Sequence, residues 1–334
     1  MNFCSRCVLP ETFPGIHFDE KHVCNYCMHA HLPDENKKKE YTHKFEALLD
    51  GVRGKHDYDV IMAYSGGKDS TYTMFTLARK YGMKILALTF DNGFISPRAL
   101  ENIMHMTDVL GATSMILRPP SEVLKKVFKL SAEKDLFGTK ALDRASSICT
   151  ACIGFVKSLV LKTALQMRIP LAAYGWSPGQ APITSSIMQT GPRIQMITNR
   201  MVRDPLFRFF PDELRPFFLS DDDLKIDKKQ WPVNIHPLAF MRYHEGDIIK
   251  TIQPLGWVMP MDTDPNSSNC TLNALANYLH REKFGFHPYA WEIAGIIRSG
   301  SMDRDEGVRK TTQPEDMNMV RYAAEMLGIE LAKK

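Results

Sequence analysis

The chain has 334 residues, of which 44% are hydrophobic and 24% are charged, so it is long enough to bury the core of one sizeable catalytic domain with smaller appendages. Its formal net charge of +4 is compatible with an anionic nucleotide or sugar substrate but is too small to indicate a dedicated nucleic-acid surface. No apolar run approaches the roughly 18 residues that span a bilayer, and no targeting or lipidation motif is evident, which favours a cytoplasmic protein without a membrane partner.

The N-terminal segment contains two Cys-x-x-Cys pairs separated by 16 residues. The four cysteines are Cys4, Cys7, Cys24 and Cys27. This spacing is typical of a structural zinc knuckle or ribbon, in which two tight turns present four thiolates. Two disulfides are the alternative, but they need an oxidising compartment, and the N-terminus has no apolar signal core. We therefore predict a zinc-binding module over residues 1–45, with His17 and His22 facing solvent and a polar linker or helix start at 33–40.

Apolar runs alternate with helical patterns between residues 50 and 190. The predicted strands lie at 59–64, 84–90, 114–118 and 170–174. The predicted helices lie at 70–81, 97–110, 121–133 and 153–167. Repeated strand and helix units of this kind predict an α/β domain with a parallel sheet, whose ligands bind at the carboxyl ends of the strands.

A glycine-rich turn joins the first predicted strand to the first predicted helix. Its residues are Ser65, Gly66, Gly67, Lys68, Asp69 and Ser70. The glycines let the backbone approach a ligand, the helix start offers free N–H groups, and Lys68 adds a positive charge, so the turn should hold the phosphates of a nucleotide. The spacing differs from both the G-x-x-x-x-G-K-[ST] loop and the G-x-G-x-x-G turn. It resembles the SGGxDS signature of the PP-loop ATP pyrophosphatases, whose HUP-like domains adenylate an oxygen, release pyrophosphate and let a nitrogen or sulfur nucleophile displace AMP.

The residues that follow the predicted strands 84–90 and 170–174 complete the expected nucleotide site. The resemblance implies ATP and Mg²⁺ as cofactors, with Asp69 on the magnesium or pyrophosphate side and Asp91 near the ribose. A plain strand-ending turn of Asp-Asn-Gly is the alternative for Asp91. After the fourth strand, Gly175 would allow close approach to the adenylate or acceptor, with Ser177 and Gln180 as hydrogen-bonding groups. A loop that merely ends the strand is the alternative there.

Three further cysteines lie outside the N-terminal module. Cys149 and Cys152 form a third Cys-x-x-Cys pair, and Cys270 is far along the chain. Three thiolates leave one iron of a [4Fe–4S] cluster open for an external sulfur ligand, whereas a zinc site would want a fourth protein ligand. The set resembles the cluster ligands of the iron–sulfur-dependent tRNA thiolation enzymes, which also carry a PP-loop and an N-terminal zinc module. Two alternatives stay open: a persulfide and resolving pair, which needs low-pKa thiols, or inert core cysteines.

The last part of the chain is expected to be less regular and then helical. Between 191 and 262 the periodicity fades, which predicts an irregular insertion, and its aromatic residues between 207 and 218 are expected to close a core or a subunit contact rather than to stack on bases. Residues 263–334 are expected to form a helical C-terminal region. The predicted helices there lie at 271–283, 288–298, 303–310 and 314–327.

Both ends of the chain carry a second resemblance. The segments 4–27 and 297–304 are similar to the corresponding segments of the N-acetyl sugar amidotransferases of surface-polysaccharide synthesis. The chain departs from that family at Gly175-Trp176-Ser177, where the family has Gly-Glu-Asn, and in its Cys-x-x-Cys at 149–152, which the family lacks. Both departures fall in the expected active-site region.

The expected activity is ATP-dependent activation of an acceptor oxygen as an acyl or imidoyl adenylate, followed by replacement with sulfur that comes from a sulfur donor and is delivered through a [4Fe–4S] cluster. The catalytic residues would be Lys68, Asp69 and the three cysteines at 149, 152 and 270, and the acceptor a tRNA or a small molecule. The alternative is amidotransfer to a sugar, with ammonia from a separate glutaminase subunit. A third hypothesis is an ATP-binding metal-containing regulator without turnover. A homodimer is compatible with each of these.

Overall fold

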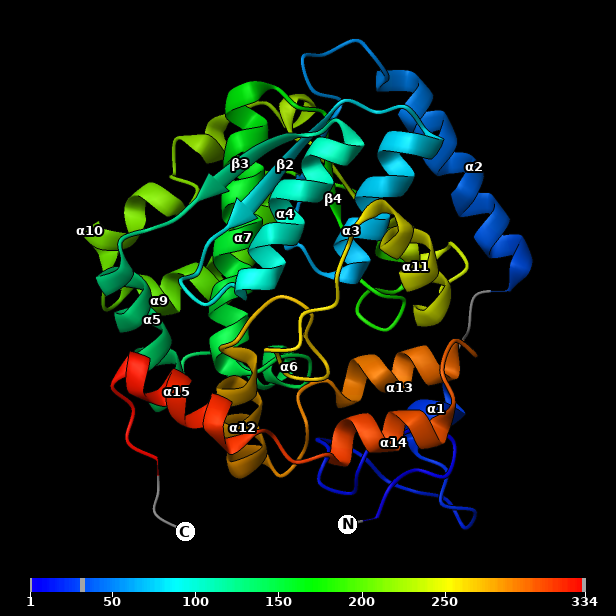
Figure 1. Ribbon diagram of the computed structural model, residues 1–334, viewed down its shortest axis with the longest axis vertical. Coiled ribbons are helices and arrows are strands. Elements are labelled where there is room, and N and C mark those ends of the chain that lie inside the picture. Colours follow the sequence, from blue (N-terminus) through cyan, green and yellow to red (C-terminus); the bar gives the residue numbers. More distant parts are fainter. Residues whose placement is uncertain (1, 31–33, 332–334) are drawn as a thin grey trace.

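The computed structural model describes residues 2–30 and 34–331 (Figure 1). Residues 1, 31–33 and 332–334 are not described, so Pro33, at the start of the predicted linker, lies outside the described part. The rest of that polar segment is the beginning of a helix, which starts at Glu35 after the Asp34 carboxylate accepts a hydrogen bond from the backbone N–H of Lys37.

One mixed sheet of six strands, in the order β3-β2-β1-β4-β6-β5, forms the centre of the molecule. The strands are β1 (Val60–Ala63), β2 (Ile85–Phe90), β3 (Thr113–Leu117), β4 (Leu171–Tyr174), β5 (Ile187–Gln189) and β6 (Val233–Ile235). Every pairing is parallel except that of β5 with β6. The predicted α/β fold with a parallel sheet is confirmed, and the carboxyl ends of β1, β2, β4 and β6 point to one edge.

Helices cover both faces of this sheet. They are α1 (Asn25–Met28), α2 (Glu35–Val52), α3 (Lys68–Phe75), α4 (Pro97–Leu110), α5 (Ser121–Glu133), α6 (Thr139–Leu142), α7 (Ser147–Met167), α8 (Pro192–Thr198), α9 (Asp204–Phe207), α10 (Pro211–Leu214), α11 (Glu245–Ile252), α12 (Asn273–Phe284), α13 (Ala290–Arg298), α14 (Arg304–Thr312) and α15 (Met317–Leu327). One core joins the sheet to α5, α7, α12 and α15, and a second joins the opposite face to α2, α3, α4 and α11. The C-terminal helices lie below the sheet in Figure 1, beside the N-terminal segment.

The helix α7 is long and apolar enough to span a membrane by length and composition, which differs from the expectation that no segment of that length exists. In its most apolar stretch of 18 residues, 61% is buried inside the protein. Its buried residues pack on β1, β2 and β4 and against Phe218, whose ring centroid lies 4.9 Å from that of Phe155. Burial on several sides explains the apolar composition, because a core helix has no polar face.

The segment 191–262 is more regular than expected. It supplies β6, which pairs with β4, and α11, which packs on α3. A strand of three residues is too short to show an alternating pattern in the sequence, so only the sheet itself reveals it. The aromatic residues between 207 and 218 pack mainly into the core beside α7, as expected, although Phe209 is 47% exposed.

Candidate functional site

The glycine-rich turn lies at the carboxyl edge of the sheet, between β1 and α3. Gly66 has a φ of +73°, and a side chain there would also meet the carbonyl of Ala99, so glycine is required. The indole Nε1 of the buried Trp257 donates to the Gly66 carbonyl at 2.9 Å. Because α3 begins directly after Gly67, its N-terminal N–H groups face the turn, which is the arrangement that binds phosphate.

The hydroxyls of this turn bond within it. Ser65 Oγ and Ser70 Oγ lie 3.1 Å apart, and Ser70 Oγ donates to the Gly67 carbonyl at 3.0 Å. These bonds hold the turn closed on itself, so the serines shape the loop in this structure rather than projecting from it.

Lys68 and Asp69 form the charged centre of the site. Lys68 Nζ lies 2.8 Å from Asp69 Oδ2, 3.3 Å from the Tyr243 hydroxyl and 3.7 Å from a carboxylate oxygen of Glu245. The Tyr243 hydroxyl in turn donates to the other Asp69 oxygen at 3.1 Å. Burial lowers the pKa of Lys68, but the surrounding negative groups outweigh it and hold that pKa well above its usual value. Lys68 is therefore a fixed cation beside the phosphate-binding turn.

The segment that carries Cys270 also touches this turn. The backbone N–H of Lys68 donates to Ser268 Oγ at 3.2 Å, so that a hydroxyl oxygen sits where a phosphate oxygen would accept. Ile95 and Cys270 form an isolated antiparallel bridge, with N–H···O bonds from Ser96 to Asn269 and from Thr271 to Phe94, each 2.9 Å. The segment after β2 thus fixes Ser268 and Cys270 together.

Two of the predicted nucleotide-site residues have structural roles in this geometry. Asp91 Oδ1 accepts from the N–H of Gly93 at 2.8 Å, and Asp91 Oδ2 lies 3.3 Å from Arg118, which is the strand-ending turn considered as the alternative. A Cβ on Gly175 would lie 2.5 Å from the Cα of Ser70 and 2.6 Å from its nitrogen. The absence of a side chain at Gly175 therefore lets β4 pack directly on the start of α3.

The three other cysteines converge at the same edge. Cys149 and Cys152 lie in the first two turns of α7, which begins earlier than predicted because the Ser146 hydroxyl caps it by accepting from the N–H of Cys149. The amide nitrogen of Asn92, directly after β2, lies 3.7 Å from Cys152 Sγ and 3.5 Å from Cys270 Sγ. One amide therefore bridges sulfurs from two distant segments.

The third sulfur has its own amide donor. Asn273 Nδ2 donates to Cys149 Sγ at 3.7 Å and also lies 3.1 Å from the Tyr289 hydroxyl. Asn92 and Asn273 are 6% and 5% exposed, and no local sequence pattern indicates their roles because each acts on sulfurs far away in the chain. Each of the three sulfurs thus receives a side-chain N–H from a buried asparagine.

Burial dominates the acid–base behaviour of these thiols. It raises the pKa of Cys149 to about 11, with the Ser146 hydroxyl acting in the opposite direction, and it also raises the pKa values of Cys152 and Cys270. This direction is opposite to the low-pKa thiols that a persulfide pair requires.

The four N-terminal cysteines form a compact buried cluster. Their sulfur atoms all lie within 4.8 Å of one another, with Cys4 to Cys27 at 3.9 Å and Cys7 to Cys24 at 3.8 Å. All four are free thiols, and backbone N–H groups of Arg6 and Cys24 point at Cys4 Sγ. Four thiols at these separations fit a tetrahedral structural zinc ion.

The module around this cluster is docked on the C-terminal helices. Arg304 Nε donates to the Cys4 carbonyl at 3.0 Å, and the Thr12 hydroxyl donates to the Gly285 carbonyl at 2.7 Å. Phe13 stacks on Trp291 at 5.7 Å. The two segments that resemble the amidotransferases, almost 300 residues apart in sequence, therefore form one structural unit.

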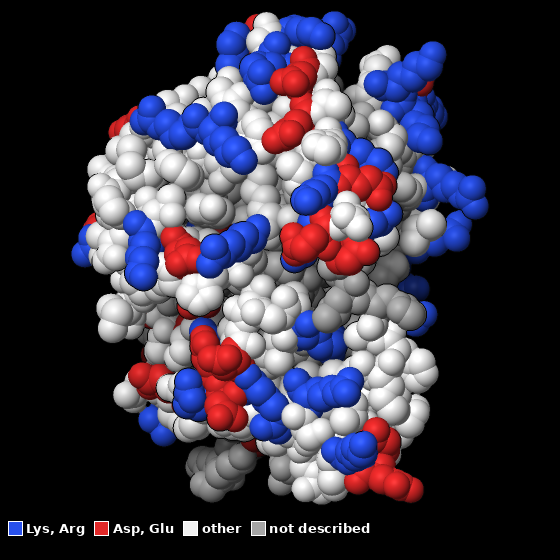
Figure 2. Space-filling model, turned by 90° about the vertical axis from the view of Figure 1, so that its right-hand side faces the viewer, with Lys and Arg blue, Asp and Glu red and all other residues white. Residues whose placement is uncertain are grey.

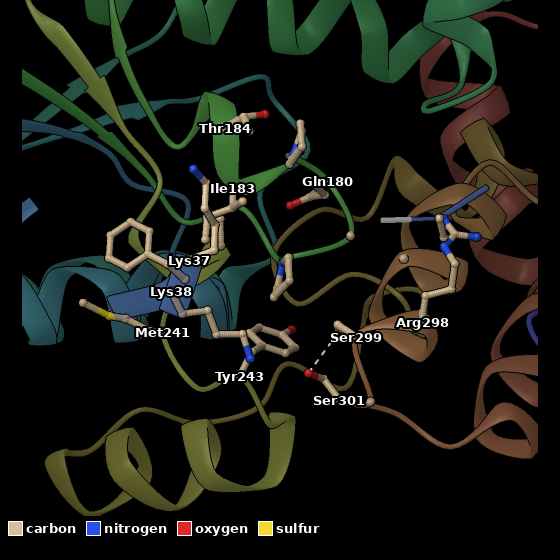
Figure 3. Close-up of a pocket in the computed structure, with 18 of the residues that line it drawn as sticks. Lys37, Lys38, Gln180, Ile183, Thr184, Met241, Tyr243, Arg298, Ser299 and Ser301 are labelled. Carbon is tan, nitrogen blue, oxygen red and sulfur yellow. Dashed lines mark hydrogen bonds between the residues drawn. The ribbon is translucent and has the colours of Figure 1, made fainter. Parts of the chain in front are cut away.

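A large cleft of about 1370 Å³ opens between this unit and the sheet domain. Its wall includes residues of the N-terminal module, the loop after β4, Tyr243 and the end of α13 (Figure 3). Arg298 and Arg144 both lie over the ring of Trp291, at 5.5 and 5.6 Å, and Arg298 Nη1 is buried without a hydrogen-bond partner among the described residues. Basic and acidic side chains are mixed on the face of the molecule shown in Figure 2.

Glu292 is a site residue that the sequence patterns did not indicate. It lies on α13, and one carboxylate oxygen accepts from the Ser177 hydroxyl at 2.7 Å. Burial raises the pKa of Glu292 to about 7, with the nearby Asp69 charge adding to the rise. Gly179 and Gly295 allow the loop after β4 to contact α13 closely. This contact places the Glu292 carboxyl group, with its raised pKa, near Lys68 and Asp69.

Comparisons with known proteins give distant likenesses. No protein-family model matches the chain. The uncharacterized protein MJ1599 of Methanocaldococcus jannaschii is 22% identical over 315 residues, which cover 93% of this chain and 94% of that protein.

Three solved structures are similar in arrangement. The U34-tRNA thiolase NcsA from Methanococcus maripaludis with its [4Fe-4S] cluster is 16% identical, with 99% of this chain and 90% of that chain covered and a TM-score of 0.37. The NMN synthetase from Francisella tularensis is 11% identical, covering 89% and 98%, with a TM-score of 0.38. The NH3-dependent NAD synthetase from Campylobacter jejuni in complex with the nitrate ion is 12% identical, covering 90% and 100%, with a TM-score of 0.37.

Proposed function

We propose that the chain is an ATP-dependent adenylating enzyme that replaces an acceptor oxygen with sulfur. ATP would bind with its phosphates at the turn 65–70, and the acceptor oxygen would attack the α-phosphorus, so that pyrophosphate leaves and an adenylate forms. A sulfur nucleophile would then attack the activated carbon, and AMP would leave with the former acceptor oxygen. A sulfur donor supplies the nucleophile, and the acceptor is a tRNA or a small molecule.

The observation that carries this proposal is the physical link between the turn and the cysteines. The segment 268–270 places a hydroxyl on the N–H of Lys68 and a thiol beside Asn92, two residues apart. Adenylation and sulfur delivery need neighbouring sites, because the nucleophile must reach the carbon from which AMP departs. In this fold the segment 268–270 would contribute to both the adenylation site and the sulfur-delivery site.

The residues present fit the cofactors of this reaction. Asp69 offers the carboxylate oxygens that Mg²⁺ prefers, and Lys68 with the α3 N–H groups would neutralise the phosphates. The three thiols converge from two segments beside asparagine N–H donors, which suits three ligands of a [4Fe–4S] cluster with hydrogen bonds to its sulfurs. When bound, such a cluster would hold an external sulfur at the iron that lacks a protein ligand.

Amidotransfer is the second candidate, and the docking of the two chain ends favours it. The contact of Arg304 with Cys4 and the cleft lined by both segments give the amidotransferase-like ends a shared structural role. A sugar with an acidic group would find Arg298 in this cleft, and ammonia would come from a separate glutaminase subunit. This reading assigns no role to the three cysteines, which is why we rank it second.

The test begins with anaerobic purification and the measurement of iron, acid-labile sulfide and zinc per chain. We expect about four iron and four sulfide per chain, one zinc, and a broad absorption near ~400 nm. Cys149→Ala should lose the iron and the absorption but retain the zinc. Ile153→Ala, on the same helix and 38% exposed, is the matched control and should retain both.

Zinc alone in the wild type, with Cys149→Ala unchanged, would contradict the cluster and move amidotransfer to first place. Asp69→Ala should then be compared with the wild type in pyrophosphate release from ATP with candidate acceptors. Loss of release supports an enzyme, whereas no release in either protein while ATP still binds would favour the regulator hypothesis.

A further inference from the structure

A second cavity lies apart from the large cleft, on the α7 side of the sheet. It has a volume of about 130 Å³ and is enclosed by α7, the ends of β4 and β6, β5 and α8. The loop after β4 separates it from the cleft, because residues 178–180 and 182–184 line the cleft and Ser185 lines the cavity. The volume is about ten times what one water needs, so the cavity can hold a small organic molecule.

The cavity contains a positive charge without a counter-ion. Lys157, on α7, is one of its lining residues, and its Nζ lies 4.6 Å from the ring centroid of Trp176. Lys157 forms no ion pair with any residue that the structure describes, and neither Asp nor Glu is among the described residues that line the cavity. Trp176 is itself stacked on His236 at 4.5 Å, so an aromatic wall stands beside the ammonium group.

Polar atoms of the wall also lack partners. The Tyr174 hydroxyl, Asn234 Oδ1 and His236 Nδ1 are all buried and make no hydrogen bond among the described residues. Tyr174 is 2% exposed and His236 3% exposed. Buried polar atoms of this kind normally have partners, and three of them in the wall of one cavity suit a polar ligand.

The chemistry of the wall specifies that ligand. Lys157 and the Tyr174 hydroxyl are donors that suit an anionic oxygen. Burial lowers the pKa of His236 to about 3, so its ring is neutral, and its Nδ1 together with Asn234 Oδ1 can accept hydrogen bonds. Leu161, Met188 and Ile194 supply an apolar side.

We infer that this cavity is a binding site for a small carboxylate that carries a hydroxyl group. The carboxylate would pair with Lys157 and the Tyr174 hydroxyl, and the ligand hydroxyl would donate to His236 Nδ1 or Asn234 Oδ1. A monoanion is favoured over phosphate because one ammonium, and no arginine, is among the described residues that line the cavity. A ligand here would contact Trp176 and Ser185, at the two ends of the loop that separates the cavity from the cleft.

Lactate and propionate form a matched pair of probes, since they differ by one hydroxyl. Binding to the purified full chain is measured by isothermal titration calorimetry, with inorganic phosphate as a third probe. We expect saturable binding of lactate, weaker binding of propionate and none of phosphate. Lys157→Met should weaken lactate binding at least ten-fold and Tyr174→Phe several-fold, whereas Lys126→Met, which removes a charge from the exposed face of α5, should leave it unchanged.

The pH dependence provides a further readout. Burial lowers the pKa of Lys157 to about 8, with the positive charge of Arg144 acting in the same direction, so lactate affinity should fall above that pH in the wild type and should not change in Lys157→Met. Near-UV circular dichroism and zinc content check that each variant is folded. Absence of saturable lactate binding to the wild type, equal affinity in Lys157→Met, or phosphate binding tighter than lactate would each overturn the inference.

Discussion

The substitution Gly175→Ala can distinguish a packing role of Gly175 from a role in binding the nucleotide. In Gly175→Ala the new Cβ would lie 2.5 Å from Ser70 Cα, 2.6 Å from Ser70 N and 2.9 Å from the Asp69 carbonyl carbon. These atoms belong to the backbone, and ordinary carbon contacts are about 3.5–4 Å, so β4 and the start of α3 must separate by about 1 Å. Overpacking of this kind costs about 1–3 kcal/mol.

The assay pairs urea unfolding with ATP binding. We expect Gly175→Ala to lower the free energy of unfolding by that amount and to weaken ATP binding, because the N–H groups of the first α3 turn move with the backbone. The matched control is Gly51→Ala, inside α2, where an added Cβ meets nothing within 4 Å. That variant should gain about 0.5–1 kcal/mol from helix propensity. Wild-type stability in Gly175→Ala, with or without loss of ATP binding, would refute the packing argument.

Three further predictions concern Glu292 and the N-terminal module. Burial raises the pKa of Glu292 from 4.5 to about 7, so between these pH values the folded protein binds a proton that the unfolded chain has lost. The free energy of unfolding should therefore fall as the pH rises across that range. In urea titrations, Glu292→Gln should remove this fall, whereas the exposed-site variant Glu325→Gln should keep it. Arg304→Ala should expose the N-terminal module to proteolysis within residues 2–30, by losing its bond to Cys4, while Arg309→Ala, exposed on the same helix, should not. Chelation should remove one zinc per chain and abolish the protection of that module in hydrogen exchange; full protection after zinc loss would contradict a structural zinc site.

The sequence was most informative where the relevant residues are close together in the chain. The turn 65–70, the two N-terminal Cys-x-x-Cys pairs and the first four strands have local signatures, and the structure places them as expected. The α/β fold followed from the alternation of strands and helices. By contrast, the start of α7 was predicted at 153 and lies at Ser147, because the capping role of Ser146 was overlooked.

The parts that could not be predicted depend on tertiary contacts. Glu292 and Asn273 sit on ordinary helices, and nothing in their neighbouring sequence distinguishes them from other surface or core residues. Their roles arise because α13 packs on the loop after β4 and α12 begins beside the cysteines. Gly175 could be predicted only in part. A glycine at a strand end indicates that another group approaches the backbone closely, but only the fold reveals that this group is the α3 backbone.

The asparagines around the three cysteines bear on which nucleophile the proposed reaction would use. Burying an amide costs free energy unless its N–H groups find good acceptors, and a neutral thiol is a weak acceptor. Asn92 and Asn273 are nevertheless buried with their N–H groups aimed at Cys149, Cys152 and Cys270. Thiolates or metal-bound sulfurs are strong enough acceptors to offset that cost, and metal ligation is what would ionise thiols whose pKa values burial raises. Asn92 Oδ1 also accepts from the N–H of Phe94, and Asn273 also bonds to the Tyr289 hydroxyl, so both residues hold the local fold as well. The placement of their N–H groups beside all three sulfurs supports the sulfur chemistry proposed above.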